Sequence, residues 1–135
     1  MGAWTVVRRP QFTAKLQDNQ KALNLKLDEL KAKHWPSGAT DEFLPLAEEF
    51  DKFSDEVDEI VSSPDPLSKL KFFSKDSNGA VYYVLRSGNW RAYYAVDEKA
   101  KSAVALLALH KAKGSAKQIL AELESALTQY RKEKG

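Results

Sequence analysis

Three short apolar segments follow one another between residues 80 and 110, and only short polar turns separate them. All three are rich in β-branched and aromatic residues, which favour strands. They are residues 80–86 (AVYYVLR), 90–96 (WRAYYAV) and 103–110 (AVALLALH). Ser87-Gly88-Asn89 is typical of a tight hairpin turn, and residues 97–101 (DEKAK) form a longer polar turn. Because a parallel connection needs a much longer crossover, the pattern predicts an antiparallel three-stranded meander.

Ahead of this meander, the sequence predicts a short strand and a long helix. Residues 4–8 (WTVVR) are apolar and β-branched, as in a strand. Apolar residues then recur at helical spacing from Phe12 to Leu30. Proline suits the first turn of a helix, where its missing N–H costs nothing. We therefore predict a helix from Pro10 to about Lys33.

The next segment is strongly acidic. Residues 39–66 hold ten acidic residues and one base, Lys52, so this segment carries −9 and the rest of the chain +11. Apolar residues from Phe43 to Ile60 predict a second helix, and we expect Pro45 in its first turn, because proline further inside removes a hydrogen bond. The charge split suggests a polyanionic partner for the basic body. Ordinary solvated faces would give the same split, and both interpretations stay open.

A last helix is predicted after the meander. Ser115-Ala116-Lys117-Gln118 has the form of a capping box, and apolar residues continue at helical spacing to Tyr130. The predicted order is β-α-α-β-β-β-α. This is an α+β fold in which an antiparallel sheet, made of the meander and the N-terminal strand, packs against the helices. With no linker and no internal repeat, we expect a single domain over residues 1–135.

Composition narrows the compartment and the chemistry. The sequence has no cysteine, so it forms no disulfide and no thiolate metal site. No segment approaches the roughly 18 apolar residues of a membrane span, and the first residues do not resemble a signal peptide. We therefore expect a cytoplasmic protein without a membrane partner. We find no Gly-rich phosphate loop and no metal-ligand spacing, and we expect no cofactor and no metal.

The element order, together with residues 84–114, resembles the RelE/ParE superfamily of toxin–antitoxin toxins. Residues 84–114 (VLRSGNWRAYYAVDEKAKSAVALLALHKAKG) contain leucine-arginine, a short Gly-containing turn, an aromatic residue and a second arginine. An apolar-aromatic strand, an acidic turn, a very apolar strand and a basic end follow. The basic end is most similar to the phage-derived HigB-like branch. The resemblance implies a sheet that binds mRNA on the ribosome, cleavage of that mRNA, and a cognate antitoxin that neutralises the toxin.

Three residues are the candidates for metal-independent RNA cleavage. Such a site needs a base, an acid and a cation that stabilises the charged phosphate. Arg91 matches the arginine after the turn of the family pattern, and Arg86 precedes that turn; arginine is always charged and grips phosphate oxygens in pairs. His110 ends the third strand, where related toxins place a catalytic residue, and its ordinary pKa suits acid–base work. Structural roles for all three stay open.

Four further residues are predicted to bind RNA. Lys111 and Lys113 could hold phosphates, or they could be solvated loop lysines. Tyr82 and Tyr93 could stack on bases, provided that they lie on the face of the sheet that is not part of the core. The register of the strands, which the sequence does not give, decides which tyrosines are exposed.

One departure from the family pattern keeps a second function open. The RelE pattern has two lysines, two residues apart, on the strand before the turn, and this chain has Tyr82 and Val84 at the matching positions. Valine can do neither proton transfer nor phosphate binding. The primary hypothesis is therefore a ribosome-dependent mRNA endoribonuclease. The alternatives are a ParE-like gyrase inhibitor or non-catalytic binding member of the same fold, and a structural phage protein with a similar sheet.

Overall fold

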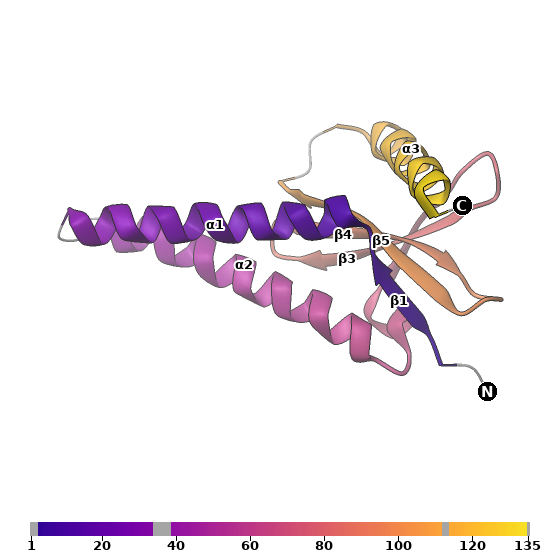
Figure 1. The fold of residues 1–135 in the computed structure, drawn as a ribbon, viewed down its shortest axis with the longest axis horizontal. Coiled ribbons are helices and arrows are strands. Elements are labelled where there is room, and N and C mark those ends of the chain that lie inside the picture. Colours follow the sequence, from indigo (N-terminus) through magenta and orange to yellow (C-terminus); the bar gives the residue numbers. More distant parts are fainter. Residues whose placement is uncertain (1–2, 34–38, 112–113, 135) are drawn as a thin grey trace.

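The computed structural model describes residues 3–33, 39–111 and 114–134, and it has an α+β fold built on one mixed sheet of five strands (Figure 1). In these residues the chain forms five strands, three α-helices and one short 3-10 helix. They are β1 (Thr5–Arg8), α1 (Pro10–Ala32), α2 (Ala39–Ser62), η1 (Pro66–Lys69), β2 (Lys71–Lys75), β3 (Val81–Ser87), β4 (Trp90–Asp97), β5 (Ser102–His110) and α3 (Ala116–Lys134).

The predicted meander is confirmed, and the rest of the sheet differs from the prediction. The strand order is β1-β5-β4-β3-β2, and β3, β4 and β5 pair antiparallel through the two predicted turns. However, β1 pairs parallel with β5, so the sheet is mixed. After β1, the two helices carry the chain to the opposite edge of the sheet, where β2 begins. No hairpin therefore sets the direction of β1.

The strand β2 was not predicted from the sequence. It forms the edge of the sheet beside β3, with a register shift between Phe72 and Ser74. Its five residues, KFFSK, contain only two apolar side chains and show no regular alternation, so the usual strand signal is absent. The strand exists because β3 offers it a row of backbone partners, which is a tertiary cause.

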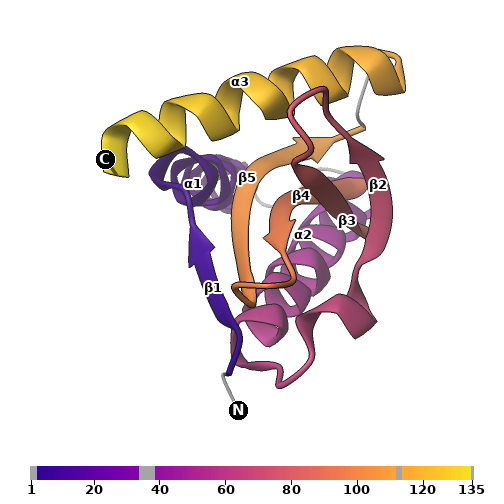
Figure 2. The same cartoon turned by 90° about the vertical axis from the view of Figure 1, so that its right-hand side faces the viewer.

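Helices cover both faces of the sheet (Figure 2). On one face, α1 and α2 pack against a core in which Phe50 and Phe53 contact Trp90 of β4, with ring centroids 5.3 and 4.9 Å apart. On the other face, α3 packs through Ile119 and Leu123 against a second core. In Figure 1, α1 and α2 extend together well beyond the sheet. Each strand of the meander therefore places alternate side chains in two different cores.

Two local predictions for the helices had different outcomes. The capping box of α3 is confirmed, since the Gln118 N–H donates to Ser115 Oγ (3.2 Å) and the Ser115 N–H donates to Gln118 Oε1 (2.9 Å). The position of Pro45 was predicted wrongly. The helix α2 begins at Ala39, so Pro45 lies inside it and not in its first turn. Only one backbone hydrogen bond is forgone, and the buried face from Phe50 onward stabilises the helix.

Candidate nucleic-acid interface

Arg86 and Arg91 lie directly opposite each other on β3 and β4. Cross-strand partners point to the same face of a sheet. That face is the one under α3, because Val84 and Tyr93, two residues away on the respective strands, belong to the core that α3 covers. The hairpin that joins β3 to β4 therefore brings together the two arginines that the sequence singled out.

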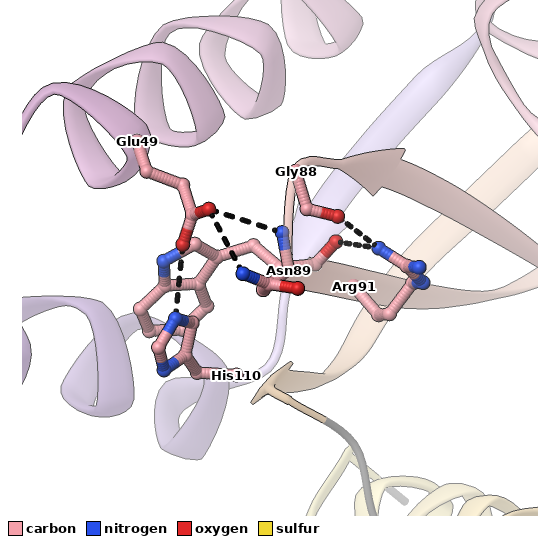
Figure 3. Close-up of polar contacts among 6 residues, drawn as sticks. Glu49, Gly88, Asn89, Arg91 and His110 are labelled. Atoms are coloured by element: carbon pink, nitrogen blue, oxygen red, sulfur yellow. Dashed lines mark hydrogen bonds and ion pairs between the residues drawn. The ribbon is translucent and has the colours of Figure 1, made fainter. Parts of the chain in front are cut away.

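Neither arginine is neutralised by a carboxylate among the described residues. Arg86 is exposed and makes no hydrogen bond or ion pair within residues 3–33, 39–111 and 114–134. Arg91 is half-buried, and its Nη1 donates to the backbone oxygens of Gly88 (2.7 Å) and Trp90 (2.8 Å) (Figure 3). Like charges directly opposite each other in a sheet are unfavourable, so an anion bound between them would relieve the repulsion.

Two lysines add positive charge near this pair. Lys71 on β2 pairs with Val84 of β3, so it shares the face of the arginines, and its side chain is exposed. Lys111 follows β5 in a left-handed conformation (φ 51°), and its N–H donates to the Asn89 oxygen at 2.8 Å, which ties it to the hairpin turn. Lys71 was not predicted as a site residue from the sequence, because only the register of β2 places it there. Lys113 lies outside the described residues.

His110 lies on the opposite face of the sheet from the arginines. Its cross-strand partner is Trp90, and the two rings are 4.8 Å apart on the face that α1 and α2 cover. His110 Nε2 lies 2.9 Å from Glu49 Oε1 of α2. The structure therefore does not bring His110 and Arg91 together at one phosphate. The reason is the alternation of side chains along β4 and β5, which the sequence did not fix.

Glu49 connects the acidic helix to the hairpin turn (Figure 3). Besides its contact with His110, it accepts hydrogen bonds at Oε2 from the N–H (3.3 Å) and the side-chain Nδ2 (3.2 Å) of Asn89. Gly88 allows this approach, because a Cβ there would lie 2.8 Å from Glu49 Oε2. Glu49 was not among the residues predicted from the sequence, although one signal was present: it stands four residues before Phe53, on the apolar stripe of α2.

Both tyrosines that were expected to stack on bases are buried. Tyr82 is 0% exposed, and its hydroxyl donates to Asp76 Oδ2 at 2.7 Å. Tyr93 is 3% exposed and packs edge-on against Phe73. Burial raises the pKa of both phenols, and for Tyr93 the charges of the two arginines partly offset that rise. The stacking prediction is therefore corrected: α3 covers this part of the sheet, and no sequence pattern indicates where that helix packs.

In the described part of the chain, no group of three or more acidic or histidine side chains is arranged to hold a metal ion. No helix in the same residues is long and apolar enough to cross a membrane. Comparison of the chain with protein-family models, curated proteins and solved structures found no match.

Proposed function

We propose that the protein is a cytoplasmic toxin of the RelE/ParE type that inhibits translation by acting on ribosome-bound mRNA. The observation that carries the proposal is the cross-strand pair of Arg86 and Arg91, which lies beside an exposed hairpin and has no carboxylate partner in the described residues. Two guanidinium groups on one face can grip adjacent oxygens of a phosphate. Lys71 and Lys111 extend the positive charge along the path of an RNA backbone.

In this proposal the arginines serve an RNA cleavage that needs no metal. The 2′-oxygen bonds to the neighbouring phosphorus and loses its proton to water, and the pentacovalent phosphate gains negative charge. The bond to the 5′-oxygen then breaks, and that oxygen takes a proton from water. Arg91 and Arg86 stabilise that charge more strongly than the charge of the ground-state phosphate, which is how they accelerate the step. His110 contributes no proton transfer here, since its ring lies on the other face.

A second function is favoured by two observations. His110 is bound to Glu49 and turned away from the arginines, and Val84, which shares their face, cannot transfer a proton. A member of this fold with a cationic face and no acid or base beside it would bind without cleaving. This candidate is a ParE-like gyrase inhibitor or another non-catalytic member. An acidic antitoxin segment would neutralise either kind by covering the same cations.

Induced expression of the full chain, combined with a translation extract, tests the proposal and separates the two candidates. Expression should arrest growth, and Arg91→Ala or Arg86→Ala should abolish the arrest. Lys21→Ala on α1 removes one exposed charge elsewhere and should leave the arrest intact. A reporter mRNA that is cut in the extract identifies the endoribonuclease, and an intact message with arrested growth identifies the binding member. Arrest that survives both arginine substitutions would overturn the proposal.

A further inference from the structure

One peptide group of the hairpin turn is held from both faces of the sheet. The N–H of the Gly88–Asn89 peptide is that of Asn89, and it donates to Glu49 Oε2 on the side of α2. The carbonyl of the same peptide is that of Gly88, and it accepts from Arg91 Nη1 at 2.7 Å. Figure 3 shows Glu49 and Arg91 on opposite sides of this turn.

The planarity of a peptide makes these two hydrogen bonds dependent on each other. In a trans peptide the N–H and the C=O lie in one plane and point in opposite directions. Once Glu49 holds the N–H, the carbonyl can point only away from α2, toward the face of the arginines. Without the hydrogen bond to Glu49 this peptide could rotate easily, because Gly88 (φ +59°) lacks the side chain that would resist the rotation.

We propose that Glu49 is a positioning residue for Arg91 and acts on it through the Gly88–Asn89 peptide. Glu49 lies on the α2 side of the turn, away from the face of the arginines. It aims the carbonyl that orients the guanidinium, and the second hydrogen bond from Asn89 Nδ2 holds the carboxylate in place. His110 contacts the other carboxylate oxygen, Oε1, which makes no hydrogen bond to the turn. This inference rests on the proposed function, because it assigns a role to Arg91 in binding phosphate.

The change in RNA affinity on removal of Glu49 should have the opposite sign from the one that net charge alone predicts. Removing a carboxylate makes the protein more positive, and a more positive protein binds a polyanion more tightly. Glu48 is the matched control, since it adjoins Glu49 on α2, is exposed, and makes no hydrogen bond or ion pair with the described residues. Glu48→Ala should therefore bind RNA as tightly as wild type or more tightly. Glu49→Ala should bind more weakly, by about threefold to tenfold.

The experiment measures the affinity of the full chain for a fluorescein-labelled 12-nucleotide oligouridylate by anisotropy. Glu49→Gln keeps an oxygen acceptor for Asn89 and should behave like Glu48→Ala. Glu49→Asp keeps the charge but its carboxylate stands one methylene further back, so it should weaken binding as Glu49→Ala does. This variant also guards against an alanine variant that fails to fold. In an Arg91→Ala background, Glu49→Ala should cause no further weakening.

The outcomes separate this inference from the proposed function. If Arg91→Ala binds as wild type does, the proposed function fails and the inference fails with it. If Arg91→Ala binds weakly while Glu49→Ala and Glu49→Asp bind no more weakly than Glu48→Ala, only the inference fails. A loss with Glu49→Gln equal to that with Glu49→Ala, or a further loss in the Arg91→Ala background, would also overturn it.

Discussion

Arg91 and His110 project from opposite faces of the sheet, although they lie on neighbouring strands and are one position apart in register. The cross-strand partner of Arg91 is Leu109, and that of His110 is Trp90. Since adjacent residues of a strand alternate between faces, a shift of one position separates the two side chains by the whole thickness of the sheet. The histidine thus belongs to the contact with α2, and the arginine to the cationic surface.

This relationship predicts that His110→Ala reduces stability and spares RNA binding. The variant loses the contact with Glu49 and the packing against Trp90, so its free energy of unfolding should fall by about 1–2 kcal/mol. Glu49 Oε2 would still hold Asn89, and the arginines would stay in place. Urea unfolding and the growth-arrest assay measure the two effects. A variant that no longer arrests growth but unfolds as wild type does would give His110 a chemical role.

The parts of the fold that the sequence predicted correctly are those with local causes. The meander follows from short turns between apolar segments, and Gly88, whose φ of +59° suits a tight turn, marks the hairpin between β3 and β4. The capping box of α3 involves two residues three positions apart. In the same way, the pattern around the turn pointed to Arg86 and Arg91 together, because a hairpin pairs residues that are close in sequence.

The parts that the sequence did not predict depend on long-range contacts. β2 forms only against β3, and the parallel pairing of β1 with β5 joins the first strand to the last. The burial of Tyr82 and Tyr93 depends on where α3 packs. Glu49 reaches Asn89 across forty residues of sequence, so nothing near either residue indicates the contact, except that the acid stands on an apolar stripe.

Gly88→Ala should destabilise the protein more than Gly79→Ala does. Both glycines have positive φ, of +59° and +89°, so alanine is unfavourable at either position. At Gly79 the new methyl group meets nothing within 4 Å, but at Gly88 it meets the Glu49 carboxylate. We expect a loss of about 1 kcal/mol at Gly79 from backbone strain alone, and a further loss of about 1 kcal/mol at Gly88. Thermal and urea unfolding of the two variants measure the difference, and equal losses would contradict the contact.

Arg86→Glu should stabilise the fold while it weakens RNA binding. The substitution replaces a like-charge pair by an opposite-charge pair with Arg91 across β3 and β4, which favours the folded state by about 0.5 kcal/mol. The same change removes one phosphate contact and adds a repulsive charge, so oligouridylate binding should fall by at least about tenfold. Lys75→Glu makes the same charge change on β2 outside the arginine pair and should weaken binding less. A parallel loss of stability and binding would contradict this prediction.

Tyr82→Phe should reduce stability at neutral pH and matter less in acid. Burial raises the pKa of Asp76, but four other effects together lower it by more, so that the pKa lies below its ordinary 3.8. These are hydrogen bonds from the Tyr82 hydroxyl and from the N–H groups of Ala80 and Asn78, and the charge of Arg131. A carboxyl whose pKa is depressed by folding stabilises the protein above its ordinary pKa, and this contribution is lost as the pH falls through the folded-state value. Without the Tyr82 hydroxyl the pKa of Asp76 is depressed less, so its ionised form contributes less to stability.

The variant should therefore lose about 1–2 kcal/mol of unfolding free energy at pH 7, where Asp76 is ionised and the hydrogen bond joins a phenol to a charge. The difference from wild type should shrink as the pH falls below 3.8, because protonation of Asp76 weakens that bond in the wild-type protein too. Urea unfolding from pH 7 down to about pH 3 measures this profile. Tyr83→Phe is the control, since its hydroxyl donates to Glu98 at the surface over 3.3 Å, and it should change stability little. A difference between Tyr82→Phe and wild type that stays constant with pH would mean that the hydroxyl stabilises the fold without acting on the ionised form of Asp76.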